Sequence, residues 1–112
     1  MDKAVLEQEM QLRVMRLIAE KPELSQRELA TELGVSLGKT NYVLRKLIEC
    51  GMAKVGNFRR SNNKVGYLYL LTPQGVAEKA KITQAFLQRK EREYEQLREE
   101  ILRLQEEISG HQ

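Results

Sequence analysis

Residues 25–51, which read SQRELATELGVSLGKTNYVLRKLIECG, decide the fold of this chain because they predict two helices joined by a tight turn. Ser25 and Glu28, three residues apart, can form a capping box at the start of the first helix, and Ser36 can cap the second. Between the helices, Gly34 can adopt the left-handed conformation that ends a helix. Such a pair of helices is typical of the helix-turn-helix that reads DNA.

Both helices have an apolar face, since their apolar residues recur at helical spacing. The positions expected to be buried are Leu29, Ala30 and Leu33 in the first helix and Thr40, Leu44, Leu47 and Ile48 in the second. The opposite face of the second helix carries Gly38, Asn41, Tyr42 and Arg45. We therefore expect the second helix to be the recognition helix.

The exposed face of this helix carries the side chains that DNA readout needs. Asn41 can bind adenine through two hydrogen bonds, Arg45 can bind guanine, and Tyr42 can bind a phosphate or contact a thymine methyl. Gly38 costs helix stability, but it removes a side chain where the backbone would approach phosphates. The alternative interpretation is that this face is only a solvated polar surface.

Positive charge is concentrated around the recognition helix. The whole chain, 112 residues with a formal net charge of +3, is only mildly basic. Residues 37–64, however, contain the single acid Glu49 and the cations Lys39, Arg45, Lys46, Lys54, Arg59, Arg60 and Lys64. A basic block this local indicates a polyanionic partner.

The chain changes from helical to extended character after Gly51. Residues 52–58 and 65–71 are rich in β-branched and aromatic residues and flank a polar, basic tip, which predicts a β-hairpin. A basic hairpin beside a helix-turn-helix is a wing that can lie along the DNA backbone or enter the minor groove; an ordinary solvated hairpin tip is the alternative. The predicted DNA-binding residues are therefore Ser36, Gly38, Lys39, Asn41, Tyr42, Arg45, Lys46, Arg59, Arg60, Asn63 and Lys64.

Thr72 and Pro73 predict the start of a long C-terminal helix, because threonine can cap it and proline at the first helical position costs no hydrogen bond. A helix over residues 73–108 would be about 54 Å long at 1.5 Å per residue, roughly twice the diameter of a small domain. Its apolar residues alternate at spacings of three and four, which is the pattern of a coiled-coil seam. The predicted dimerisation residues are Leu87, Tyr94, Leu97, Ile101, Leu104 and Ile108.

Charged residues lie beside this seam and on it. Glu93 and Arg98 occupy flanking positions that suit an interchain ion pair in a parallel dimer, whereas Lys90 lies on the seam itself. A helix folded back on its own domain is the alternative to a dimer. A homodimer would place two recognition helices about one turn of DNA apart, so that together they read an inverted repeat.

Three stretches carry a family resemblance: LSQRELA at residues 24–30, GVSLGKTNY at 34–42 and LTPQG at 71–75. From about Leu12 to Leu104 the chain resembles the MarR-type winged-helix transcriptional regulators, and most closely the subgroup associated with exopolysaccharide (EPS) gene clusters. The resemblance implies a cytoplasmic, dimeric, DNA-binding regulator. Its recognition helix would enter the major groove and its wing the neighbouring minor groove.

Two features depart from the broader family pattern. The wing has Asn62 and Lys64 where many members carry an aspartate and an arginine, which would shift a minor-groove arginine contact to Arg59 or Arg60. Typical members also have additional helical sequence that helps to build the dimer and a ligand pocket. The resemblance therefore assigns no small-molecule effector to this chain.

Catalysis and metal binding find little support in the sequence. The only histidine, His111, lies at the C-terminus, and no cluster of metal ligands, phosphate loop or activated nucleophile is visible. We expect no enzyme activity and no cofactor. No stretch is long and apolar enough to span a bilayer, and the single cysteine, Cys50, suits a reducing compartment, so we expect a cytoplasmic protein.

Together these patterns predict a mainly α protein with a small β-hairpin, of the α+β class. Residues 1–75 would form the winged helix-turn-helix domain, and residues 76–112 the C-terminal helix for dimerisation. We expect double-stranded DNA and a second copy of the chain as partners. An adaptor that uses the winged helix to bind a protein partner remains the alternative, since both functions occur on this fold.

Overall fold

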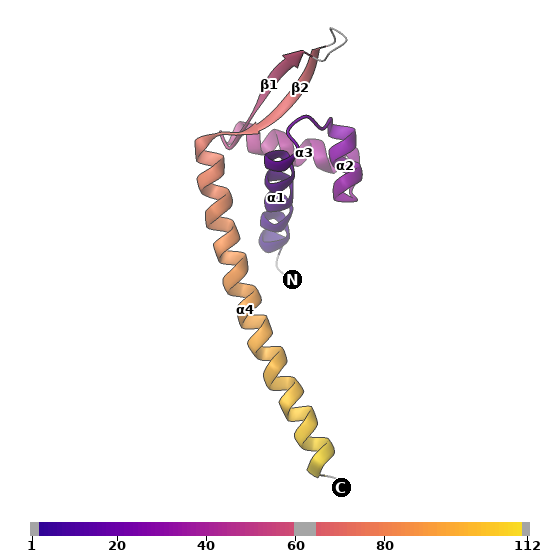
Figure 1. Cartoon of the computed structure of the whole chain (residues 1–112), viewed down its shortest axis with the longest axis vertical. Coiled ribbons are helices and arrows are strands. Elements are labelled where there is room, and N and C mark those ends of the chain that lie inside the picture. The colour runs from indigo at the N-terminus through magenta and orange to yellow at the C-terminus, as the bar shows by residue number, and fades with distance from the viewer. Residues whose placement is uncertain (1–2, 60–64, 111–112) are drawn as a thin grey trace. The chain divides into compact units, whose positions relative to one another are not determined.

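The computed structural model describes residues 3–59 and 65–110. The elements follow one another as α1 (Lys3–Glu20), α2 (Gln26–Leu33), α3 (Leu37–Glu49), β1 (Ala53–Arg59), β2 (Val65–Leu71) and α4 (Pro73–Gly110) (Figure 1). This order confirms the predicted fold class, a mostly helical chain with one β-hairpin and a long C-terminal helix. The chain divides into two compact units, Met1–Ile82 and Thr83–Gln112, each of which is described by itself.

Both helices of the helix-turn-helix, and the turn between them, have the capping residues that the sequence predicts. The backbone N–H of Glu28 donates to Ser25 Oγ at 3.1 Å, and the backbone N–H of Ser25 donates to Glu28 Oε1 at 3.0 Å, which completes the capping box. Gly34 has a φ of 69°, the left-handed conformation expected of it. The backbone N–H of Lys39 donates to Ser36 Oγ at 3.1 Å, so Ser36 caps α3.

The core of the first unit lies where α1, α2, α3 and the base of the hairpin meet. Its apolar residues include Val14, Met15 and Ile18 of α1, Leu29 and Leu33 of α2, Val43, Leu44 and Leu47 of α3, and Ala53 and Tyr69 of the strands. Thr40 is also buried, and its Oγ1 donates to the Ser36 carbonyl at 3.0 Å. One expectation was wrong: Val43 belongs to the buried face of α3, while Ile48 is only half-buried.

The two strands form an antiparallel hairpin whose base is attached to the helices (Figure 1). Ala53 pairs with Leu71 at the base and Arg59 with Val65 at the far end. The backbone N–H of Tyr69 donates to the carbonyl of Pro22 at 3.0 Å, which links β2 to the segment after α1. The hairpin is therefore a wing held at its base by the core.

The first turn of α4 packs closely against the base of this hairpin. Thr72 Oγ1 accepts from the backbone N–H of Gly75 at 3.0 Å and donates to the carbonyl of Gly51 at 2.6 Å. Gly75 is buried, and a Cβ there would overlap the carbonyl group of Met52. Ile82, further along α4, is also buried and belongs to the first unit.

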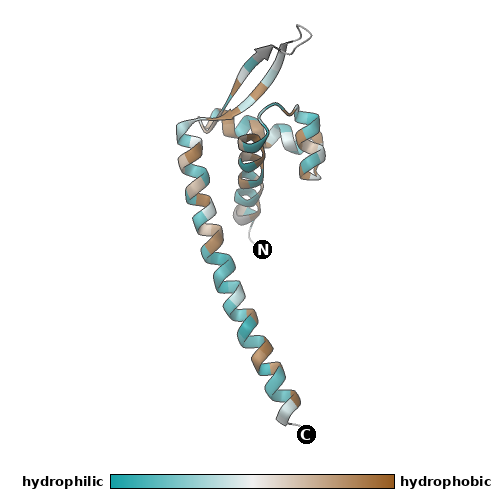
Figure 2. Ribbon diagram, in the orientation of Figure 1, coloured by the Kyte–Doolittle hydropathy of each residue, from teal (hydrophilic) through white to brown (hydrophobic). Residues whose placement is uncertain are grey.

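The second unit is the C-terminal part of α4, where apolar residues recur among hydrophilic ones (Figure 2). The six predicted seam side chains are between 46% and 68% exposed: Leu87, Tyr94, Leu97, Ile101, Leu104 and Ile108. A helix with this much exposed apolar surface has no core of its own to bury it. The Nζ of Lys90, on the predicted seam, lies 3.3 Å from Glu93 Oε2.

Candidate nucleic-acid interface

One face of α3 is available to a partner and carries polar and basic side chains. Thr40, Leu44 and Leu47 are buried against the core, so the opposite side of the helix is turned outward. There Lys39, Tyr42 and Arg45 are exposed, and Tyr42 retains 54% of its accessible surface. Asn41, Tyr42, Arg45, Lys46 and Glu49 line a shallow hollow of about 430 Å³ on this face. The structure thus brings together the side chains that the sequence assigned to the recognition face.

Two of the predicted cations lie close to the ring of Tyr42. The Nζ of Lys39 lies 5.7 Å from the centre of the Tyr42 ring, and the Nζ of Lys46 lies 6.0 Å from it. Both distances are within the range of cation–π attraction. Lys46 also lies 3.9 Å from Glu7 Oε2 of α1, an ion pair between partly exposed side chains that contributes little to stability. A phosphate approaching Tyr42 would therefore meet positive charge from both lysines.

The side chain of Asn41 is less exposed than the sequence indicated. It is half-buried, because its amide contacts the start of α2: Asn41 Nδ2 donates a hydrogen bond to Gln26 Oε1 at 3.1 Å. Sequence reasoning missed Gln26, which immediately follows the N-cap Ser25. Nothing in the local sequence indicated this contact, because Gln26 opens α2 at the end away from the tight turn that leads to α3.

Ser36 and Gly38 shape the beginning of the recognition helix. The Ser36 hydroxyl caps α3, as described above, so its first role is structural. Gly38 has open space around it: among residues 3–59 and 65–110, leaving aside its chain neighbours and the adjoining backbone of α3, no atom lies within 4 Å of the position that a Cβ would occupy. Packing among the described residues therefore does not require a glycine at this position.

The wing carries the remaining predicted contacts. Arg59 is the last residue of β1. Arg60, Asn63 and Lys64 lie outside the described residues, as does Asn62, and their contribution stays a prediction.

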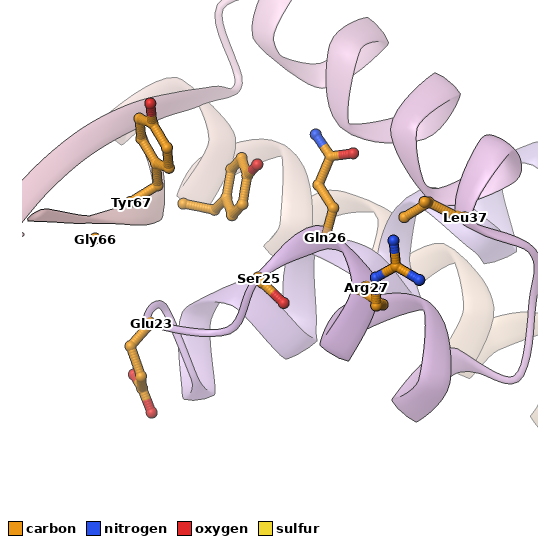
Figure 3. Close-up of a pocket in the computed structure, with 8 residues that line it drawn as sticks. Glu23, Ser25, Gln26, Arg27, Leu37, Gly66 and Tyr67 are labelled. Atoms are coloured by element: carbon orange, nitrogen blue, oxygen red, sulfur yellow. The ribbon is translucent and has the colours of Figure 1, made fainter. Parts of the chain in front are cut away.

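A second hollow, of about 450 Å³, lies between the start of α2, the start of α3 and strand β2. Figure 3 shows Gln26 standing between Tyr67 of β2 and Leu37 of α3, with Arg27 nearby. Tyr67 is 63% exposed. Sequence reasoning did not single out Arg27 or Tyr67, because nothing in their local pattern relates the wing to the start of α2.

Neither a cluster of metal ligands nor a membrane-spanning helix is present among the described residues. Among residues 3–59 and 65–110, no three His, Cys, Asp or Glu side chains lie together in a way that could hold a metal ion. Within the same residues, every helix is too short or too polar to cross a membrane. Cys50 is a free thiol, exposed at the end of α3.

Comparisons with known proteins agree with this geometry. Residues 7–54, slightly less than half of the chain, match a family model described as winged helix-turn-helix DNA-binding. No curated protein matches the chain in sequence.

Solved structures show the same fold. The apo form of wild-type MarR from E. coli is 29% identical with a TM-score of 0.54, over 67% of this chain and 54% of that one, so the chain spans about half of that protein. A PadR-like transcriptional regulator from Bacillus cereus is 20% identical with a TM-score of 0.69, over 85% of this chain and 93% of that one. A Streptococcus transcriptional regulator is 14% identical with a TM-score of 0.69, over 81% and 94%. Residues 7–54 are thus similar to winged helix-turn-helix DNA-binding domains, and the chain has the fold of MarR- and PadR-type transcriptional regulators.

Proposed function

We propose that this chain, which has the fold of a winged helix-turn-helix regulator, is a sequence-specific transcription regulator that binds an inverted-repeat operator as a homodimer. The observation that carries the proposal is the outward face of α3. It combines Asn41 and Arg45, which suit base edges, with Lys39 and Lys46, whose charges converge on Tyr42. Base-reading and phosphate-binding groups on one helix are what sequence-specific recognition in a major groove requires.

Gly38 supports the same orientation of α3. A glycine in the first turn lowers helix stability relative to alanine, and no atom of the described chain lies close enough to require it. A DNA backbone that packs against this turn from outside would explain the presence of the glycine. Glycine lets the helix backbone approach such a partner more closely than any other residue does.

The second part of the proposal is a dimer formed through the C-terminal part of α4. The seam residues defined above expose apolar side chains on a helix that has no core of its own. A second copy of the same helix would bury this surface by packing of side chains between the two seams. Because each winged domain precedes its helix in the chain, a parallel pair would bring both domains to the same end.

The charges beside the seam favour the parallel arrangement. One flank repeats glutamate every seven residues, at Glu93, Glu100 and Glu107, while the other carries Glu91, Arg98 and Gln105. In an antiparallel pair the glutamate flanks would face each other and repel, whereas in a parallel pair Glu93 would face Arg98 of the second copy. Arg98→Glu should therefore weaken the dimer, and the double variant Glu93→Arg/Arg98→Glu should restore it.

The proposal extends to the location of the protein and to its target genes. A regulator of this kind would act in the cytoplasm, and the sequence resemblance described above suggests exopolysaccharide genes as its targets.

The decisive experiment is selection of bound sequences from a library of genomic duplexes, at two salt concentrations, with the full chain. Enrichment of one inverted repeat, with affinity that falls steeply as salt rises, would support the proposal, because phosphate contacts release counterions. Weak binding without a preferred sequence at either salt would contradict it. That outcome would favour the adaptor, for which the exposed Tyr67 and Val55 of the wing offer apolar contact surface.

A further inference from the structure

We propose that Gln26 positions Asn41 for base recognition, so that the specificity of α3 depends on an amide pair and not on Asn41 alone. The inference rests on the proposed function. It assigns to the first residue of α2 a role that neither its helix nor its local sequence suggests.

The geometry of the pair is direct. Gln26 is the first residue of α2, and its Oε1 accepts a hydrogen bond from Asn41 Nδ2 at 3.1 Å across the helix-turn-helix. Both side chains are half-buried. Water still reaches both amides, so neither would become a buried, unsatisfied polar group if the other were absent. The main effect of the hydrogen bond is therefore to fix the orientation of the Asn41 amide.

The chemistry of the two amides makes this orientation useful. An asparagine amide has one acceptor oxygen and two N–H donors. Gln26 takes one donor of Asn41, which leaves the second N–H and Oδ1, the pair that adenine N7 and N6 require. A primary amide that nothing holds can rotate and present its oxygen where its nitrogen was. The bond to Gln26 removes this freedom before DNA binds, and such preorganisation favours the correct base.

The position of the pair agrees with this role. Gln26 lines the hollow shared with Leu37 and Tyr67 (Figure 3), and Asn41 lines the hollow on the face of α3. The hydrogen bond thus joins the two hollows of the recognition surface. Gln26 lies at the edge of the surface that would meet DNA, where it can act on Asn41 without itself reading a base.

The test compares Gln26→Met with Gln26→Glu in the full-length protein. Methionine keeps the length of the side chain but lacks the amide, whereas glutamate keeps an acceptor oxygen. The measurement is the affinity for the selected duplex and for duplexes in which each base pair is replaced in turn. The base pair read by Asn41 is the one at which Asn41→Ala loses discrimination.

At that base pair we expect Gln26→Met to lower discrimination about fivefold to tenfold, within the range of one bidentate contact, and to leave the other positions unchanged. Gln26→Glu should retain the discrimination, although its charge lowers affinity for every duplex. Adding Gln26→Met to Asn41→Ala should cause no further loss there, since the two residues act as a unit. Unchanged discrimination in Gln26→Met, with only lower thermal stability, would overturn the inference.

A second measurement separates this inference from the proposed function. In the DNA-free protein, Gln26→Met should move the NMR resonances of the Asn41 side-chain amide and leave those of Asn57, on the exposed part of β1, in place. Unmoved Asn41 resonances would overturn the positioning role whatever the protein binds. A parent protein that selects no sequence would overturn the proposed function, and with it the purpose of the pair, even if the resonances move.

Discussion

Gly75 lies directly against the carbonyl group of Met52, so close that a Cβ at position 75 would overlap the carbonyl oxygen and stand 2.8 Å from the carbonyl carbon. This contact is where α4 meets the base of the wing. It is reinforced by Thr72, which accepts from the Gly75 amide and whose own backbone N–H donates to the Met52 carbonyl at 3.0 Å. The position of the wing and the start of the C-terminal helix are therefore fixed together.

Gly75→Ala should destabilise the protein, because the new methyl group must displace a backbone segment and not a flexible side chain. The expected loss is about 1 to 3 kcal/mol in the free energy of unfolding, as for other overpacked sites. Chemical denaturation followed by circular dichroism measures it. Gln74→Ala, at the exposed neighbouring position, is the control and should change stability little. An unchanged midpoint in Gly75→Ala would show that α4 can shift at no cost.

Gly38→Ala should separate stability from DNA binding. Open space surrounds this position, and alanine favours a helix by up to about 1 kcal/mol over glycine, so the free protein should become more stable. Affinity for DNA should fall nonetheless, since the methyl group would lie between the first turn of α3 and the backbone of the duplex. Denaturation and binding titrations on the same sample give both quantities. A variant that gains stability and binds as tightly as the parent would show that DNA does not approach α3 at this turn.

Arg45→Ala should weaken binding to the selected operator by about 1 to 3 kcal/mol and relax the preference at the base pair that Arg45 contacts. The residue is exposed on the outward face of α3, so its loss leaves the core intact. Fluorescence anisotropy with the operator and with single-base variants measures the effect. Arg16→Ala, an exposed arginine on α1, serves as the control for a change of charge alone. Equal losses in the two variants would contradict the assignment of the recognition face.

The basic residues of the wing should act on all sequences alike. Replacing Arg59, Arg60 or Lys64 with glutamine removes charge that we expect to lie near phosphates. Each loss of a phosphate contact should reduce the slope of log K against log salt by about one unit and leave base preferences unchanged. Titrations at several salt concentrations supply the slopes. A parent-like slope in the triple variant would place the wing away from the DNA.

Leu97→Asp should dissociate the dimer, because it places a charge in the apolar seam between two copies of α4. Leu102→Asp is the matched control: it lies on the same helix with a similar exposed fraction, 51% against 55% for Leu97, but outside the alternating pattern. Sedimentation equilibrium on both variants distinguishes the two positions. Monomers in both, or dimers in both, would reject the seam that the spacing predicts.

The fold could be predicted from the sequence to a large extent, because its main signals are local. Ser25, Glu28, Gly34 and Ser36 act through neighbours within a few residues, and all four have the predicted geometry. Pro73 begins α4 as expected. The capping and turn preferences of such residues depend on backbone conformation nearby and need no knowledge of the remaining chain.

The candidate site was predicted less completely. The polar face of α3 followed from helical periodicity, and Tyr42 and Arg45 are exposed on it. The same periodicity could not show that Val43 is buried while Ile48 lies at the edge of the core, because both positions border the apolar face. It also could not show that Asn41 is held by a residue from another helix.

The sequence by itself indicated the two helices of the helix-turn-helix, the residues of its turn, the hairpin and the long C-terminal helix, and it showed where apolar side chains recur along α4. Each of these depends on spacing along the chain, which side-chain and backbone preferences convert directly into local structure. The bounds differ by one or two residues, since the first strand covers Ala53–Arg59 instead of 52–58 and α4 ends at Gly110 instead of 108. Only the tertiary structure decided that Gln26 holds Asn41 and that Gly75 must lack a side chain beside Met52. These contacts depend on how closely separate elements approach one another, and that distance is set by the packing of the whole core.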